Sequence, residues 1–235
     1  MSVLRLTHLL GSFFAIVLTL AHVGTVSASS ATTELYAALA AKAPDLSRTV
    51  LKTALKATQC AISQGTAEPR RLAIIDYSLP STEKRLWIFD LQRRSLLLQE
   101  LVAHGKNSGE VTATAFSNTL GSYQSSIGLF LGEETYSGKH GYSLRLDGLE
   151  PGVNDLARER AIVIHGADYV DTSWINEHGR IGRSLGCPAV PREVADHVVD
   201  SLKGGQLIFT YYPDQEWLSS SPYLNCDAPK LAAHP

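Results

Sequence analysis

The first regular pattern along the chain is an apolar stripe of helical period between residues 33 and 64. Its members are Val50, Leu51, Ala54, Leu55, Ala57, Ala61 and Ile62. Leu46 and Ser47 fit the N′ and N-cap positions of a hydrophobic staple that closes on Leu51. Gly65 suits the C′ position that ends a helix. We therefore predict helical structure over residues 33–64.

From residue 71 the pattern changes to short apolar runs separated by turn residues, which is typical of β-strands. The predicted strands are Arg71–Tyr77, Arg85–Leu91, Ser95–Ala103, Tyr142–Leu146, Ala161–Ile164 and Leu207–Tyr212. Two later segments are predicted helices, Asn154–Arg160 and Arg192–Leu202, and the second stops at a pair of glycines. Between the third and fourth strands, residues 104–141 are rich in Gly, Ser, Thr, Asn and Tyr. A long polar stretch inside a compact domain usually carries function.

The first 28 residues have the pattern of a secretory signal peptide. Arg5 is the only charged side chain before Glu34, the stretch Leu9–Val23 is almost wholly apolar, and small residues end at Ala28. We predict cleavage after Ala28, which places the protein in the periplasm, or secreted and associated with the cell wall. The alternative is an uncleaved anchor, but the apolar run is shorter than the roughly 20 residues that span a membrane.

Composition narrows the class of protein. Apolar residues make up 44% of the 235 positions and charged residues 19%, which is typical of a globular chain. The formal net charge is −2 and no basic block is present, so nucleic acid is not an expected partner.

The cysteines Cys60, Cys187 and Cys226 are odd in number. In an oxidising compartment, an odd count suggests one disulfide and one free thiol. We expect Cys60 to pair with Cys226 and Cys187 to be free and reactive. The alternative for Cys60 is a small buried hydrophobe near the end of the predicted helix.

The candidate chemistry lies in Ile162–Gly166 and Gly182–Pro188. His165 follows a buried apolar run, where a side chain is held rigidly as a catalytic base requires. Cys187 follows a glycine in a polar turn, and a neighbouring imidazole activates a thiol as nucleophile. Backbone N–H groups of such a turn stabilise the oxyanion of a tetrahedral intermediate.

Pro188 excludes one familiar arrangement. Because proline has no N–H, the residue after the nucleophile cannot be an oxyanion donor, as it is in α/β-hydrolases. The donors must come from Cys187 itself, Gly186 or Leu185. The base precedes the nucleophile by 22 positions, which fits neither the papain order nor the caspase spacing.

These residues carry a family resemblance. The order His-Gly, then Ser-x-Gly-Cys, resembles the L,D-transpeptidase catalytic domain (YkuD-like) family, most closely its second branch, of murein L,D-transpeptidase catalytic domain proteins. The resemblance covers roughly residues 70–213. It extends to the segments 126–128, 136–144 and 148–150, which read Ser-Ile-Gly, Tyr-Ser-Gly-Lys-His-Gly-Tyr-Ser-Leu and Gly-Leu-Glu.

The resemblance implies a mainly β (α+β) fold: a β-rich catalytic domain with an N-terminal helical segment and peripheral helices. It implies peptidoglycan stem peptides as substrate and an acyl-enzyme on Cys187, with His165 as base. The family orients its histidine through a backbone carbonyl, so no acidic third member is expected. Asp168 is the alternative orienting group, although an aspartate in a turn usually serves local turn chemistry.

The sequence departs from the better-known branch of the family at two positions. Leu185 stands where that branch has a second histidine, and Ala189 stands where it has Arg or Asn. Arg183 or Arg180 is a candidate for the missing positive charge. The resemblance further suggests Tyr136, Lys139 and His140 as residues of the donor cleft, with Ser126 and Ser184 as orienting groups.

The sequence also leads to expectations about cofactors, segments and function. The chain lacks the short His and Cys spacings of zinc sites, so neither a metal nor a cofactor is expected. The expected segments are a signal peptide (1–28), a helical segment (29–66), the catalytic domain (67–213) and a polar tail (214–235). The leading function is an L,D-transpeptidase. A hydrolase on the same site, either an L,D-carboxypeptidase or a cross-link-cleaving peptidase, and a non-catalytic wall-binding module are the alternatives.

Overall fold

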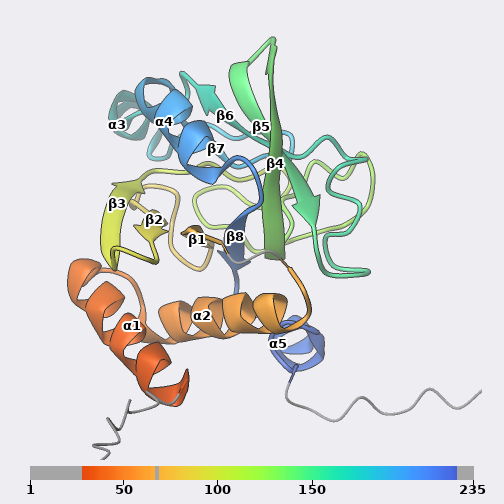
Figure 1. The fold of residues 1–235 in the computed structure, drawn as a ribbon. Helices are drawn as coiled ribbons and strands as arrows, with labels where there is room; N and C mark the ends of the chain where they lie inside the picture. Colours follow the sequence, from red (N-terminus) through yellow and green to blue (C-terminus); the bar gives the residue numbers. More distant parts are fainter. Residues whose placement is uncertain (1–27, 67–68, 227–235) are drawn as a thin grey trace, which may run out of the picture.

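The computed structural model describes residues 28–66 and 69–226, so the predicted signal peptide lies outside the described residues except for Ala28. Eight strands form one mixed sheet in the order β3-β2-β1-β8-β4-β5-β6-β7 (Figure 1). The strands are β1 (Arg71–Asp76), β2 (Leu86–Asp90), β3 (Ser95–Glu100), β4 (Gly128–Gly138), β5 (Gly141–Gly148), β6 (Val163–Ala167), β7 (Ala189–Pro191) and β8 (Gln206–Tyr211). The helices are α1 (Ala28–Lys42), α2 (Arg48–Ser63), α3 (Thr172–His178), α4 (Arg192–Leu202) and α5 (Gln215–Ser220). The predicted mainly β fold with peripheral helices is confirmed.

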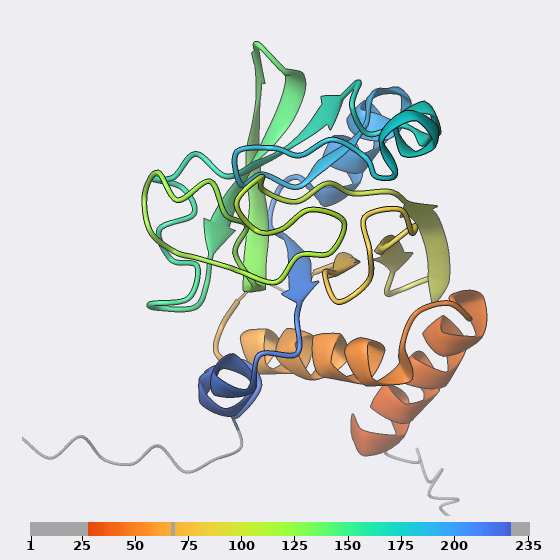
Figure 2. The same ribbon diagram turned by 180° about the vertical axis from the view of Figure 1, so that it is seen from behind.

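The sheet nearly closes on itself. β1 with β8 and β6 with β7 are parallel pairs, and the other neighbours are antiparallel. The chain that leaves β3, at one edge, returns to β7 at the other edge, where the Ala103 N–H donates to the Ala189 carbonyl over 2.8 Å. The long connection from β3 to β4 then crosses the face seen in Figure 2. This connection and the chain around β7 carry much of the candidate site.

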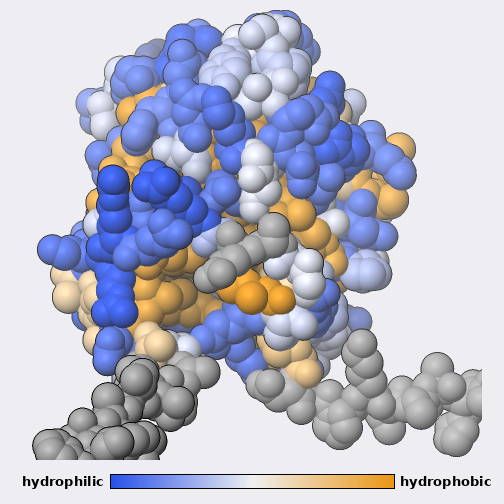
Figure 3. Space-filling model, in the orientation of Figure 1, coloured by the Kyte–Doolittle hydropathy of each residue, from blue (hydrophilic) through white to orange (hydrophobic). Residues whose placement is uncertain are grey.

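Helices cover both faces of the sheet. Leu72 and Ile74 of β1 pack toward the cluster that contains α1, α2 and α5, whereas Ala73 and Ile75 pack toward the cluster that contains α4. Because successive strand residues point to opposite faces, a strand that is buried on both faces is apolar throughout. α2 and α4 lie on opposite sides of the sheet in Figure 1. In Figure 3 apolar side chains reach the surface mainly in the lower half of the view, near α1 and α2.

The N-terminal helical prediction is correct in type, and it contains two helices. They are separated because Pro44 has no N–H to continue the ladder and lies in the break between α1 and α2. The Ala43 N–H still donates to Leu39 O, which closes the last turn of α1. Ser47 is the N-cap of α2 as predicted, although its side chain makes no capping hydrogen bond.

The predicted helix Asn154–Arg160 is wrong, because this segment is a series of turns. The Asn154 side chain is used elsewhere: its amide donates to Ile127 O and Leu129 O, and its oxygen accepts from Glu150 N–H. Such side-chain bonds to the backbone compete with helix formation.

Four elements escaped prediction: β4, β7, α3 and α5. β4 falls entirely within the polar stretch 104–141, where small and hydroxyl residues hide the alternation of a strand.

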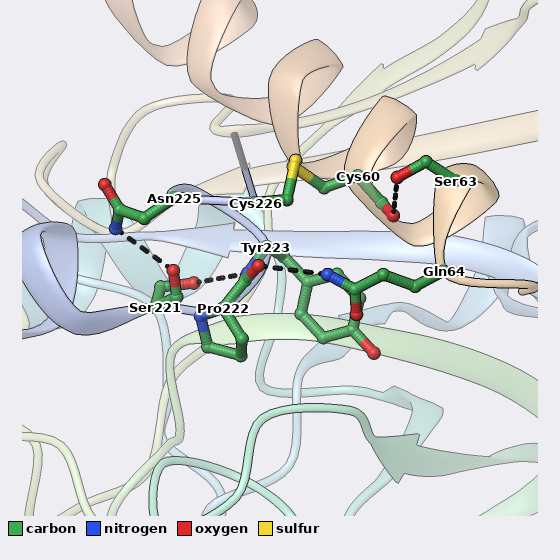
Figure 4. The surroundings of a disulfide bond; sticks show 8 residues. All are labelled: Cys60, Ser63, Gln64, Ser221, Pro222, Tyr223, Asn225 and Cys226. Carbon is green, nitrogen blue, oxygen red and sulfur yellow. Dashed lines mark hydrogen bonds between the residues drawn. A yellow bond between two sulfur atoms is a disulfide. The ribbon is translucent and has the colours of Figure 1, made fainter. Parts of the chain in front are cut away.

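Residues 212–226, which follow β8, include the helix α5 and pack against the rest of the fold. Trp217 of α5 is buried, and its indole N–H donates to Glu150 Oε2 over 2.9 Å. Cys226 forms a disulfide with Cys60 of α2, with 5.8 Å between the Cα atoms. Figure 4 shows Gln64 beside this bond, donating to Pro222 O over 3.1 Å. Within the described residues, no helix is long and apolar enough to cross a membrane.

Candidate active site

His165 lies in the middle of β6 rather than at its end, between Ser143 of β5 and Ala189 of β7. The side chain is 3% exposed. Its Nδ1 lies 3.0 Å from the Gly166 carbonyl oxygen. Since a carbonyl only accepts, we assign the proton to Nδ1, which leaves the lone pair on Nε2 as the acceptor. The imidazole is therefore oriented by a backbone carbonyl, with Nε2 available as an acceptor.

The surroundings keep this imidazole neutral. Burial lowers the pKa of His165 below its ordinary value, and the bond to Gly166 O opposes that shift. The nearby groups His140, Arg192 and Lys139 lower the pKa further. The His140 ring packs against His165 with 4.4 Å between ring centroids. A neutral imidazole can accept a proton, which is the role of a general base.

Asp168 does not orient His165. Its carboxylate is paired with the guanidinium of Arg192, with Oδ2 3.0 Å from Nη2. The Gly166 carbonyl occupies the position that an acidic third member would take. The alternative that used Asp168 is therefore not supported by the contacts.

Cys187 lies on a bend directly before β7 and is the free cysteine of the described residues. Ser184 fixes this bend, because its Oγ donates to Cys187 O over 2.6 Å and accepts from Gly186 N–H over 3.1 Å. Gly186 has a φ of 124°, and a Cβ there would lie 2.9 Å from Gln124 O. Ser125 Oγ donates to Gly186 O over 3.0 Å. The bend that carries the thiol is thus held on both sides.

The same contacts narrow the choice of oxyanion donors. The Gly186 N–H is already bonded to Ser184 Oγ. Of the three donors proposed from the sequence, Cys187 and Leu185 remain.

The Cys187 thiol is neutral at rest. Burial raises its pKa above the ordinary value, whereas hydrogen bonds from the backbone at Val163 and Cys187 and the charge of Arg160 oppose that shift. The sulfur lies 3.6 Å from Ala161 O, to which it donates. A neutral thiol can act as a nucleophile only once a base has taken its proton, and His165 lines the same cleft.

One cleft, with a volume of about 440 Å³, contains both groups. It is lined by Gly121, Tyr123, Tyr136, Lys139, His140, Arg160, Ala161, Val163, His165, Tyr169, Arg183, Ser184, Leu185 and Cys187. Eight residues proposed from the sequence line this cleft: His165 and Cys187 together with Tyr136, Lys139, His140, Arg183, Ser184 and Leu185. Ser126 lies outside the lining, and its hydroxyl donates to Ser117 O over 2.9 Å in a buried structural contact.

Six lining residues were not proposed as site residues from the sequence: Gly121, Tyr123, Arg160, Ala161, Val163 and Tyr169. Tyr123 and Ala161 have left-handed φ angles of 55° and 54°, which are uncommon for residues other than glycine. The sequence offered one weak signal that Arg160 belongs to the site, because it is a charged residue directly before a buried strand. The cations proposed from the sequence have partners elsewhere: Arg180 Nε and Arg183 Nη1 lie 3.1 and 2.8 Å from oxygens of Glu110.

Cysteine-nucleophile enzymes have a thiol in one cleft with an imidazole whose free nitrogen can accept a proton. A model of the L,D-transpeptidase catalytic domain matches residues 42–211. The chain belongs to the L,D-transpeptidase catalytic domain family, as its motifs predicted. No curated protein matches the sequence.

The chain also has low similarity to solved structures of L,D-transpeptidases. An L,D-transpeptidase from Mycobacterium smegmatis is 12% identical with a TM-score of 0.39, and the match covers 61% of this chain and 59% of that chain. L,D-transpeptidase 3 from Mycobacterium tuberculosis is 15% identical with a TM-score of 0.37, covering 61% and 62%. An Enterococcus faecium L,D-transpeptidase variant is 12% identical with a TM-score of 0.36, covering 60% and 50%. The chain thus spans about three fifths or less of the length of these structures.

Proposed function

We propose that this protein is an exported L,D-transpeptidase that acts on the peptide stems of peptidoglycan, with Cys187 as nucleophile and His165 as base. The observation that carries the proposal is that the free thiol and a neutral imidazole, oriented by Gly166 O, line one cleft of a chain of this family. Export rests on the N-terminal sequence pattern alone.

The first half of the reaction forms an acyl-enzyme. The Cys187 sulfur attacks a carbonyl carbon of the stem peptide while the thiol proton moves to His165 Nε2. The N–H groups of Cys187 and Leu185 stabilise the oxyanion of the tetrahedral intermediate. As the C–N bond breaks, His165 returns the proton to the leaving amine, and a D-amino acid departs. A thioester on Cys187 remains.

The second half transfers the acyl group. An acceptor amine attacks the thioester carbonyl, His165 takes the proton of that amine, and the sulfur leaves to re-form the thiol. Attack by water at the same carbonyl would give hydrolysis. Transfer therefore depends on keeping water from the thioester until the amine arrives.

An exchange experiment separates transfer from hydrolysis. Incubating the mature protein with a tetrapeptide donor and a non-canonical D-amino acid should yield the donor with its terminal residue exchanged, as read by mass spectrometry. If only the shortened tripeptide forms at every amine concentration, the hydrolase alternative replaces this proposal.

The pH dependence of kcat/KM tests the role of His165. Because the folded pKa of His165 is lowered, the imidazole stays neutral to below pH 6.5 and takes up a proton only as the pH falls further. Activity should therefore be full at neutral pH and decline with an apparent pKa below 6.5. His140→Gln removes a group that lowers this pKa, so the acid limb should move to higher pH. An acid limb at or above pH 6.5 in the unmodified protein would contradict the assignment.

A further inference from the structure

The cleft around Cys187 has an uneven charge. Three of its lining residues are cations, namely Lys139, Arg160 and Arg183, and no aspartate or glutamate of the described chain lines it. A cleft lined by one sign of charge raises the local concentration of ligands of the opposite sign. The cleft is therefore suited to a ligand that carries a carboxylate.

Arg160 differs from the other two cations because its charge is fixed in place without a counter-charge. Its Nη1 donates to Ser117 O and Ser126 Oγ, and its Nη2 donates to Ser122 Oγ over 3.2 Å and Gln124 O over 2.6 Å. All four acceptors are neutral oxygens. The guanidinium is held rigidly, yet its positive charge is not cancelled.

The other two cations of the cleft, Arg183 and Lys139, are less suited to binding a carboxylate. Arg183 is paired with Glu110, so part of its charge is neutralised. Lys139 is exposed in the turn between β4 and β5, where a long flexible side chain remains solvated.

Arg160 also lies close to the reacting sulfur. The carbonyl of the next residue, Ala161, accepts from the Cys187 thiol over 3.6 Å. Arg160 and Cys187 line the same cleft, and the positive charge of Arg160 opposes the rise in the pKa of the thiol. An anion bound by Arg160 would thus lie in the same cleft as the sulfur of Cys187.

We propose that Arg160 is an anion subsite that binds a carboxylate close to the reacting carbon of the donor. The choice of ligand rests on the proposed function: in a tetrapeptide stem, the terminal carboxylate belongs to the residue that leaves, one residue beyond the attacked carbonyl. Arg160 is then a specificity-determining residue that selects donors with a free terminal carboxylate over donors that are capped or extended there.

Two small alkylating reagents test the subsite without any peptidoglycan substrate. Iodoacetate carries a carboxylate next to the reacting carbon, and iodoacetamide is its neutral counterpart. With both reagents the Cys187 sulfur displaces iodide, as an S–C bond forms and the C–I bond breaks. The ratio of the two rate constants, relative to the same ratio for the neutral thiol N-acetylcysteamine, reports carboxylate binding and cancels changes in thiol ionisation.

We expect this relative ratio to exceed one by about tenfold in the unmodified protein, because a fixed positive charge in the same cleft favours the anionic reagent. Arg160→Gln should lower it by roughly fivefold or more. Arg160→Lys loses the fork of hydrogen bonds to the loop but keeps the charge, so it should keep most of the preference. Arg158→Gln is the matched control, because Arg158 is a nearby arginine already paired with Glu134 and Asp147, and it should leave the ratio unchanged.

Three results would overturn the inference. The first is an equal ratio in the unmodified protein and in Arg160→Gln, and the second is a fall that appears in Arg183→Gln instead. The third is an equal loss in Arg160→Lys and Arg160→Gln, which would assign the effect to the position of the loop. Because alkylation needs no turnover, a protein that prefers iodoacetate through Arg160 but fails to process stem peptides would keep the subsite and refute the proposed function.

Discussion

Replacing Cys187 by alanine should abolish the processing of stem peptides and leave the fold in place. The sulfur forms the covalent bond of the acyl-enzyme, so its loss should lower kcat by at least about 10³-fold, as losses of catalytic nucleophiles do. The thiol makes weak hydrogen bonds, a 3.6 Å bond to Ala161 O and bonds from the backbone at Val163 and Cys187, so the melting temperature should change little. Activity on purified muropeptides and thermal unfolding, measured on the same preparation, check both parts.

His165→Ala provides the partner measurement. Because the base and the nucleophile act as one unit, the losses in Cys187→Ala and His165→Ala should not add in the double variant. Additive losses would show that the two side chains act independently, contrary to the proposed mechanism.

Removing the disulfide should have the largest effect on stability. The bond closes a loop between positions 166 residues apart, and it ties the segment after α5 to α2. Replacing both Cys60 and Cys226 with alanine should lower the free energy of unfolding by about 2–4 kcal/mol, with a chain-entropy limit of roughly 5 kcal/mol. Urea denaturation with and without reductant measures it.

The double variant also supplies its own control. Reductant should destabilise the unmodified protein to about the level of the variant and leave the variant unchanged. Alkylation of Cys187 by iodoacetamide should stay the same in both, because the cleft and the disulfide are built from different residues. Equal stability of the unmodified protein with and without reductant would contradict the role assigned to the bond.

The sequence was most informative where chemistry needs particular residue types in a fixed order. His165 and Cys187 were recognisable as site candidates because a purely structural role rarely explains both features at once. One is a histidine at an apolar strand, and the other is a cysteine directly after a glycine. Arg192–Leu202 was predicted with its observed bounds, since its apolar stripe and the glycines that follow leave little choice. The strands of the β1–β3 region were likewise visible as apolar runs between turns.

The sequence was least informative where tertiary contacts decide the conformation. In the segment from Asn154 to Arg160, the Asn154 side chain bonds to the backbone of β4 and of the chain just before it, which local propensity cannot reveal. Arg160 joined the candidate site only because the turns that replace the helix bring it beside Cys187. The sequence also could not show which cations have a counter-charge. Arg180 and Arg183 pair with Glu110, which lies about 70 residues away in the sequence.

The most direct test of the central claim is to trap the acyl-enzyme. The mature protein would be mixed with a tetrapeptide donor in the absence of an acceptor amine, quenched in acid at early times, digested, and analysed by mass spectrometry. The account predicts that the peptide carrying Cys187 gains the mass of the donor less the released D-amino acid, and that Cys187→Ala gains nothing. An adduct on any other residue, or release of the D-amino acid by Cys187→Ala, would contradict it.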